Sequence, residues 1–232
     1  MRFMFRFFRS SETHLLEAPP LILFDYDGVI ADSFEVYFSE FTHVCATLGF
    51  DRINSEEGFL RLFDGNLVAQ LVKAGFPIRK LKKLATDFKP QIEAANARIS
   101  PFPGIVEILA TLSDCYPVMI ITANTTDVVQ QFLDAHRLYK IKGVLGSDIE
   151  TSKIKKIRIA RKLFPLHTPY YIGDTKGDML EARRAGAIPV AAGWGWHNSQ
   201  RLQTATPLHI LQKKEDLIPF FEFVSPAFHK KQ

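Results

Sequence analysis

The spacing of apolar residues divides the chain into parts. A short apolar run at 21–24 leads directly into acids and a glycine, which is typical of a buried strand that ends in a loop. From residue 34 the apolar residues recur three and four positions apart, which predicts an amphipathic helix. Further helices are predicted at 55–63, 65–74 and 77–96. Because nothing between residues 34 and 101 has the pattern of a strand, we interpret this block as an all-helical insertion.

After residue 101 short apolar runs alternate with amphipathic segments. Strands are predicted at 117–123, 143–147, 169–173 and 188–192, and helices at 104–113, 126–136, 152–164 and 177–186. The tail, 205–224, is expected to add one strand and one helix. Strands that alternate with helices form parallel βαβ units, whose helices cover both faces of one sheet. The sequence therefore predicts an α/β fold, a Rossmann-like parallel sheet with helices on both faces, interrupted by the helical insertion.

The same changes of pattern set the expected domain boundaries. Residues 1–19 form an N-terminal extension, residues 20–33 and 102–232 the α/β core, and residues 34–101 the helical insertion. The extension carries arginines and phenylalanines at helical spacing, so residues 1–14 could contact an anionic membrane surface. The alternative, which we favour, is a loosely ordered segment ahead of the fold.

Composition narrows the class of protein. The chain has 232 residues, 47% of them hydrophobic and 23% charged, so a disordered or fibrous protein is excluded. The net charge of +4 is mild, and we expect no nucleic-acid partner. Cys45 and Cys115 cannot form a disulfide framework and lack the spacing of a zinc site, so we expect reduced thiols and a cytoplasmic protein. No apolar run has the length of a membrane span, and the sequence does not indicate an oligomeric state.

The residues that follow the predicted strands carry the candidate chemistry. In a parallel α/β sheet, ligands bind at the carboxyl ends of the strands, near the point where the strand order reverses. The polar residues at these ends are Asp25 with Asp27, Thr122 with Asn124, Ser147 with Asp148, and Asp174. Carboxylates that gather repel one another unless a cation neutralises them. The sequence therefore predicts a hard divalent cation, most simply Mg²⁺ bound by carboxylates, carbonyls and water.

The pair Asp25 and Asp27 is the most informative feature. In an extended backbone, side chains two residues apart point the same way, so one carboxylate can act as nucleophile and the other as general acid and base. A second stretch repeats the pattern, because Asp174 follows a buried strand and Asp178 lies near a helix start. Thr122 offers a hydroxyl and nearby backbone N–H groups that can bind phosphoryl oxygens.

Together these motifs resemble those of the haloacid dehalogenase superfamily, specifically its phosphoglycolate-phosphatase-like branch. The motif DxDGxxxDS, a strand ending in Thr or Ser, a lysine at a helix start and GDxxxD occur in the family's order over about residues 21–196. The residues that match are Asp25, Asp27, Gly28, Asp32 and Ser33, then Thr122, then Lys153, then Gly173, Asp174 and Asp178. The inserted helices match the family's helical cap domain.

The resemblance implies a role for each residue. Asp25 attacks phosphorus and becomes an aspartyl phosphate, while Asp27 protonates the leaving alcohol and then deprotonates the attacking water. Mg²⁺ would be bound by Asp25, the carbonyl of Asp27 and Asp174, with Asp178 in a supporting position. The phosphoryl oxygens would be bound by Thr122, Asn124 and Lys153.

The predicted function is thus a Mg²⁺-dependent phosphatase acting on a small phosphorylated metabolite, phosphoglycolate-like by resemblance. A sugar phosphomutase would use the same chemistry, and a non-catalytic interaction protein could use the same fold. Dehalogenation is disfavoured, because a departing halide needs no proton donor. Two questions stay open: whether Lys153 or a neighbour, Lys155 or Lys156, binds the phosphate, and whether Trp194 and Trp196 frame the site or only pack. No cap residue is assigned to the substrate.

Overall fold

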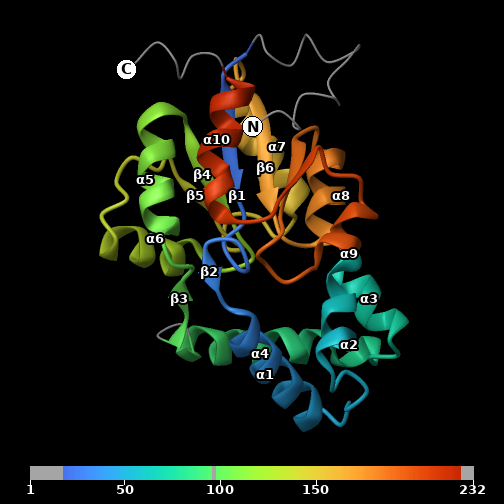
Figure 1. The fold of residues 1–232 in the computed structure, drawn as a ribbon. Helices are drawn as coiled ribbons and strands as arrows, with labels where there is room; N and C mark the ends of the chain where they lie inside the picture. Colours follow the sequence, from blue (N-terminus) through green and yellow to red (C-terminus); the bar gives the residue numbers. More distant parts are fainter. Residues whose placement is uncertain (1–17, 96–97, 226–232) are drawn as a thin grey trace.

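The computed structural model describes residues 18–95 and 98–225, and its centre is a six-stranded sheet. The strands lie in the order β5-β4-β1-β6-β7-β8, and every neighbouring pair is parallel (Figure 1). Their bounds are β1 Pro20–Phe24, β4 Val118–Ile121, β5 Val144–Leu145, β6 Thr168–Gly173, β7 Ile188–Ala192 and β8 His209–Leu211. The strand order reverses at β1, with β4 and β5 on one side and β6 to β8 on the other. Ligands bind at such a switch point.

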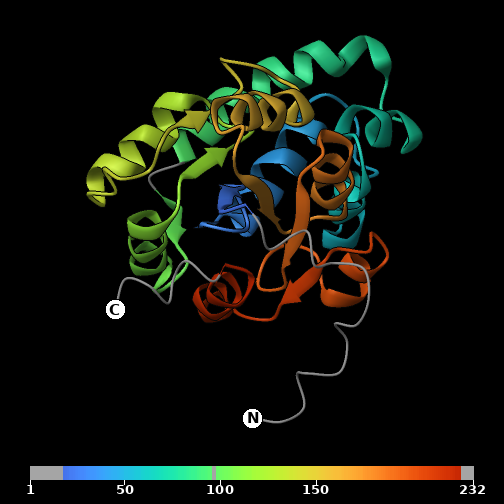
Figure 2. The same cartoon turned by 90° about the horizontal axis from the view of Figure 1, so that it is seen from above.

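Helices cover both faces of the sheet. On one face lie α5 (Ile105–Cys115), α6 (Thr126–Ala135) and α10 (Leu217–Val224). On the other lie α7 (Lys153–Leu163) and α8 (Lys176–Ala185), with the short α9 (Ser199–Gln203) beside α8. Figure 2 shows α10, in red, and α7, in gold, on opposite sides of the strands. The predicted α/β fold with a Rossmann-like parallel core is confirmed, and α9 is an element that the sequence pattern did not predict.

Strand β1 is apolar along its whole length because both of its faces are buried. Ile22 and Phe24 pack into the core beneath α5, α6 and α10, whereas Leu21 and Leu23 pack into the core beneath α7 and α8. All four side chains are fully buried. A strand covered on both sides has no polar alternation. Asp25, which follows the strand, is therefore the first polar side chain at its carboxyl end.

The helical insertion forms a layer at one end of the sheet, where β1 leads into β2 (Figure 1). Its elements are α1 (Phe34–Thr47), α2 (Glu56–Leu60), η2 (Arg61–Asp64), α3 (Leu67–Lys73), η3 (Ile78–Lys80) and α4 (Leu81–Ala95). These elements share an aromatic core that includes Phe41, Phe59 and Phe76. The helical cap expected from the sequence is therefore present, and much of the chain's phenylalanine fills its interior.

One strand lies inside the block in which none was expected. β2 (Ala31–Asp32) pairs antiparallel with β3 (Ser100–Pro101), so that Ala31 is opposite Pro101 and Asp32 is opposite Ser100. The pairing joins the point where the chain leaves the core to the point where it returns. A two-residue strand held only by a contact so distant in sequence leaves no periodic pattern, which explains why the prediction of a strand-free block was wrong at its last residues.

Three predictions about the rest of the chain have separate outcomes. Residues 1–17 lie outside the described residues, and with them the predicted membrane contact of residues 1–14. Among the helices that the structure describes, none has both the length and the apolar character needed to cross a membrane. The cytoplasmic location and the exact boundaries between core and cap stay predictions.

Candidate active site

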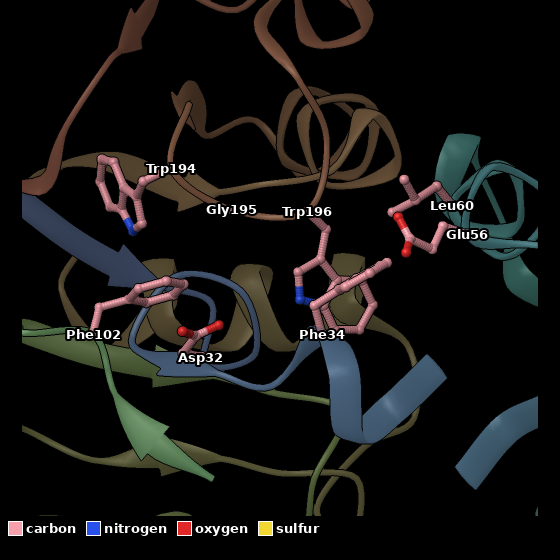
Figure 3. Close-up of a pocket in the computed structure, with 8 residues that line it drawn as sticks. All are labelled: Asp32, Phe34, Glu56, Leu60, Phe102, Trp194, Gly195 and Trp196. Atoms are coloured by element: carbon pink, nitrogen blue, oxygen red, sulfur yellow. The ribbon is translucent and has the colours of Figure 1, made fainter. Parts of the chain in front are cut away.

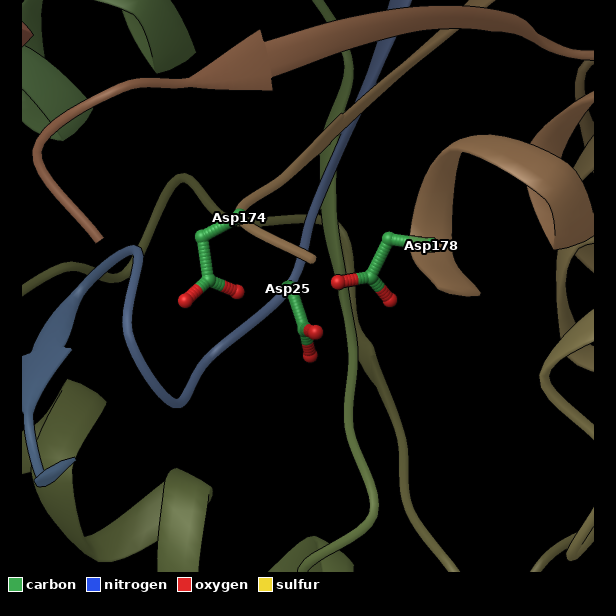
Figure 4. A group of neighbouring side chains, drawn as sticks. All are labelled: Asp25, Asp174 and Asp178. Carbon is green, nitrogen blue, oxygen red and sulfur yellow. The ribbon is translucent and has the colours of Figure 1, made fainter. Parts of the chain in front are cut away.

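Three carboxylates meet at the carboxyl ends of the central strands. Asp25 follows β1, Asp174 follows β6, and Asp178 lies in the first turn of α8. One oxygen from each lies within 4.8 Å of the others, and all three residues are buried. Figure 4 shows the three side chains turned toward a common point. The parallel topology thus brings together acids that are about 150 residues apart in the sequence.

The start of α8 explains how Asp178 is held. Thr175 is the N-cap of this helix, and its hydroxyl oxygen accepts a hydrogen bond from the backbone N–H of Asp178 at 3.1 Å. In return, Asp178 Oδ2 accepts from the backbone N–H of Thr175 at 3.0 Å and from its hydroxyl at 2.6 Å. This capping box fixes Oδ2. The other oxygen, Oδ1, accepts a hydrogen bond from Lys153.

Backbone packs unusually close around Asp174. Its Oδ2 accepts a hydrogen bond from the backbone N–H of Trp196 at 2.8 Å. A Cβ atom on Gly28 would lie 2.0 Å from the same oxygen, and one on Gly195 would lie 2.2 Å from Asp174 Cβ. Gly28 also has a φ of +74°, in the left-handed region that favours glycine. These two glycines are required because the chain passes directly against the carboxylate.

The structure answers which lysine reaches the site. Lys153 Nζ lies 2.7 Å from Asp25 Oδ2 and also contacts Asp178 Oδ1, and its side chain is only 17% exposed. Lys155 points to the surface, where it pairs with Glu150 at 3.2 Å. Lys156 is buried, but its Nζ donates to the backbone carbonyl at the end of β4. Only Lys153 among the three contacts the carboxylate cluster.

Thr122 and Asn124 lie beside the cluster at the end of β4. Thr122 is fully buried, and its Oγ1 accepts a hydrogen bond from the backbone N–H of Asn124 at 3.0 Å. The amide of Asn124 donates to Asp27 Oδ2 at 2.9 Å. Asp148, also expected at a strand end, is not part of the site, because its carboxylate accepts hydrogen bonds from Thr126 at the start of α6.

Asp27 is held apart from the three-carboxylate group. Its Oδ2 accepts hydrogen bonds from Asn124 and from the hydroxyl of Tyr37, in helix α1 of the cap, at 3.1 Å. Oδ1 is buried and has no hydrogen-bond partner among the described residues. The side chain of Asp27 is therefore oriented by one residue of the core and one of the cap.

Burial dominates the electrostatics of these acids. It raises the pKa of Asp25 to about 7, with Asp178 and Asp27 contributing and Lys153 opposing. Burial likewise raises the pKa of Asp27 to about 6, and it raises the pKa of Asp174 well above its usual value, with help from Asp178 and Asp25. For Asp178, burial is outweighed by Lys153 and by the donors of the capping box, and its pKa is lowered. Two of the three clustered carboxyls thus resist ionisation without a further cation.

A divalent cation fits this donor set. Three carboxylates supply the hard oxygen ligands that such ions bind, and the cation would offset the repulsion that raises the pKa of Asp25 and Asp174. Lys153 alone supplies one positive charge for three acids. The chemistry of the residues present therefore supports a metal site at Asp25 and Asp174, with Asp178 beside it in the supporting position expected from the sequence, because both of its oxygens already accept hydrogen bonds.

A family model for haloacid dehalogenase-like hydrolases matches residues 22–192, which is most of the chain. The chain belongs to the haloacid dehalogenase-like hydrolases. The phosphoglycolate phosphatase of Synechococcus elongatus is 27% identical over 203 residues, covering 85% of this chain and 94% of that protein. The probable phosphatase IndB of Dickeya dadantii is 26% identical and covers 86% of this chain and 92% of its own.

A solved structure gives the same family. A haloacid dehalogenase-like hydrolase from Streptococcus pneumoniae superposes with a TM-score of 0.74 at 25% identity, covering 90% of this chain and 99% of that one. The predicted superfamily and phosphoglycolate-phosphatase-like branch are confirmed, as is the prediction of a phosphoric monoester hydrolase.

Two aromatic residues of this hydrolase, Tyr37 and Trp196, contact residues of the site. The sequence leaves open whether Trp196 frames the site or only packs, and it assigns no role to Tyr37. The helical spacing of Tyr37 with phenylalanines predicts only that it packs in the cap core, where its ring does lie. Trp196 does pack in that core, against Phe63 and Phe59 at ring-centroid distances of 4.9 and 5.7 Å, but its backbone N–H also holds Asp174. No pattern in a single sequence reveals a contact made by a backbone N–H.

Trp194 and Asp32 line a cavity that also borders Gly195 and Trp196, the segment that contacts Asp174. The cavity has a volume of about 210 Å³. Figure 3 shows the residues that line it: Asp32, Phe34, Glu56, Leu60, Phe102, Trp194, Gly195 and Trp196. The indole N–H of Trp194 donates to the Val29 carbonyl at 3.1 Å. Trp194 therefore packs at this cavity, and Asp32 lines it rather than joining the carboxylate cluster.

Proposed function

We propose that this hydrolase is a Mg²⁺-dependent phosphatase that acts on a small organic phosphate monoester, with phosphoglycolate as the first candidate substrate. The observation that carries the proposal is the contact of Lys153 with both Asp25 and Asp178, next to Asp174. A phosphoryl group carries two negative charges, so its transfer to a carboxylate needs neighbouring positive charge. Lys153 supplies part of this positive charge, next to the carboxylate of Asp25 that would attack phosphorus.

Asp25 is suited to the role of nucleophile. Its Oδ1 accepts a hydrogen bond from the backbone N–H of Tyr26 at 2.9 Å and its Oδ2 accepts from Lys153, so the carboxyl is fixed in one orientation. Thr122 lies at the end of the adjacent strand, and its hydroxyl oxygen accepts a hydrogen bond from the Asn124 N–H, so the hydroxyl proton points away from that donor. We infer that Thr122 and Lys153 bind the phosphoryl oxygens.

Asp27 is suited to proton transfer. Burial raises its pKa to about 6, so a fraction of the molecules carries the proton near neutral pH, as a general acid requires. In the proposed reaction it protonates the leaving alcohol and later accepts a proton from water. A bound Mg²⁺ would neutralise the carboxylates of Asp25, Asp174 and Asp178 and stabilise the charge on the phosphoryl group.

The test is hydrolysis of p-nitrophenyl phosphate and of a panel of alkyl phosphates, namely phosphoglycolate, sugar phosphates and nucleoside monophosphates. We expect phosphate release that needs Mg²⁺ and stops with EDTA, and at least about a thousandfold loss in Asp25→Asn, which removes the nucleophile. Lys155→Met is the matched control, because Lys155 is exposed. Robust turnover by Asp25→Asn, or none by the wild type on the whole panel, would contradict the proposal. Conversion of one sugar monophosphate into its isomer, stimulated by an added sugar bisphosphate and without net phosphate release, would indicate a mutase instead.

A further inference from the structure

We propose that Tyr37 is a positioning residue for Asp27, and that it leaves Oδ1 as the single oxygen that exchanges protons with substrate and water. The inference rests on the function proposed above and adds a cap residue to its proton transfer. Tyr37 Oη donates to Asp27 Oδ2 at 3.1 Å, and Asn124 Nδ2 donates to the same oxygen at 2.9 Å. Both donors thus bind one oxygen of the carboxyl.

The other carboxyl oxygen of Asp27, Oδ1, is available for proton transfer. Asp27 Oδ1 is buried, yet it has no hydrogen-bond partner in the described part of the chain. The hydroxyl of Ser33 is likewise buried and has no hydrogen-bond partner among the described residues. A buried polar atom without a partner is costly, and in an enzyme it marks a place for a reacting group. With Oδ2 accepting two hydrogen bonds, the proton of the neutral carboxyl resides on Oδ1.

The hydroxyl of Tyr37 is held in place by packing. Its ring lies 5.6 Å from the Trp196 ring and 5.9 Å from the Phe88 ring, measured between centroids. The residues one turn away on α1, Phe34 and Phe41, belong to the same aromatic core but carry no polar atom. Of these three residues only Tyr37 carries a polar atom, and packing around its ring fixes where the hydroxyl points.

The proton balance of both steps runs through Oδ1. As an oxygen of Asp25 bonds to phosphorus, the ester P–O bond breaks and its electron pair stays on the leaving oxygen, which takes the proton from Asp27 Oδ1. The products are the alcohol, the aspartyl phosphate and an ionised Asp27. Water then attacks phosphorus, one of its protons moves to Oδ1, and the bond from phosphorus to Asp25 breaks. Inorganic phosphate leaves, and both carboxyls return to their starting states.

The experiment compares Tyr37→Phe with wild type on two leaving groups. p-Nitrophenolate departs without a proton, whereas an alkoxide needs one, so only the alkyl ester depends on a well-oriented general acid. For the fastest alkyl phosphate of the panel, we expect kcat/KM to fall about tenfold or more. For p-nitrophenyl phosphate, kcat/KM should stay within about twofold. Because the ratio is taken within one preparation, a fraction of misfolded protein cancels.

Two further variants test whether the Tyr37 hydroxyl acts through its orientation. Tyr139→Phe removes a hydroxyl from a side chain that is 73% exposed, and it should leave kcat/KM unchanged for both substrates. Phe88→Leu keeps the Tyr37 hydroxyl but loosens the packing that orients it, so it should lower kcat/KM for the alkyl ester more than for p-nitrophenyl phosphate, by a smaller factor than Tyr37→Phe. Equal losses on both substrates in Tyr37→Phe, or no loss on the alkyl ester, would overturn the inference while the wild-type activity still supports the phosphatase. A wild type without phosphatase activity would overturn both.

Discussion

Replacing Gly28 with alanine should damage the metal site, and the structure supplies a control for the strain that the change also brings. Gly28 and Gly49 both have positive φ angles, +74° and +70°. An alanine in that region costs roughly 1–2 kcal/mol at either position. The surroundings differ, however. A Cβ at Gly49 meets only Lys80 Nζ at 3.9 Å, whereas a Cβ at Gly28 would lie 2.0 Å from Asp174 Oδ2.

Both variants carry the same backbone strain, so the difference between their effects on activity comes from the clash of the new Cβ with Asp174. Asp174 must move by an ångström or more to relieve a 2.0 Å contact, and a displacement of that size in an active site can cost about a hundredfold in rate. We expect Gly28→Ala to lose about a hundredfold in kcat/KM and to need at least about tenfold more Mg²⁺ for half-maximal activity. Gly49→Ala should keep both values within about twofold.

The measurements are chemical unfolding of both variants and phosphate release over a Mg²⁺ titration. Both should lose free energy of unfolding, and Gly28→Ala should lose more because its Cβ also meets the Trp196 ring at 2.8 Å. If the two variants respond alike to Mg²⁺ and turn over at similar rates, then Asp174 does not hold the ion and the proposed metal site is wrong.

Three further substitutions test other contacts. Lys153→Met should lower kcat/KM at least about a hundredfold, because it removes the cation beside the nucleophile, while the exposed Lys155→Met should not; equal effects in a phosphatase assay would argue against the assignment. Burial lowers the pKa of Lys156 to about 8, so the folded protein loses this proton at a lower pH than the unfolded chain does. The free energy of unfolding should therefore rise, by up to about 3 kcal/mol, between about pH 8 and 10. Urea titrations of Lys156→Met should show that rise reduced, and an unchanged rise would contradict it. Arg201→Met, which removes a bidentate hydrogen bond to a cap carboxylate, should cost about 1–2 kcal/mol in the same titrations, against less than about 0.5 for the exposed Lys140→Met.

The parts of the site that the sequence predicted are those carried by local signals. Asp25 and Asp174 each follow an apolar run, and parallel strands place such residues at one edge of a sheet wherever the strands lie. Lys153 begins the helix after β5, so the same rule brings it near. The choice among three lysines needed the structure, because residues three apart on a helix share a face and differ only in what lies opposite.

The parts that stayed hidden depend on contacts between distant segments. The β2–β3 ladder exists only because the chain returns beside its point of departure. The bond from Tyr37 to Asp27 depends on how α1 packs on the core, and no residue pattern within α1 specifies it. The same holds for Trp196, whose contribution to Asp174 comes from a backbone group that every residue except proline carries.

The segment after β7 spans both halves of the molecule. Trp196 holds Asp174 by its backbone and the cap by its ring, His197 donates to the Leu60 carbonyl of the cap at 2.9 Å, and Arg201 pairs with Asp64 at 2.7 Å. Thermodynamic linkage makes such a connection work equally in both directions. If docking of the cap raises the affinity for an ion at Asp174 by some factor, then binding of the ion raises the docking equilibrium constant by the same factor. The coupling can therefore be measured either from ion affinity or from cap docking.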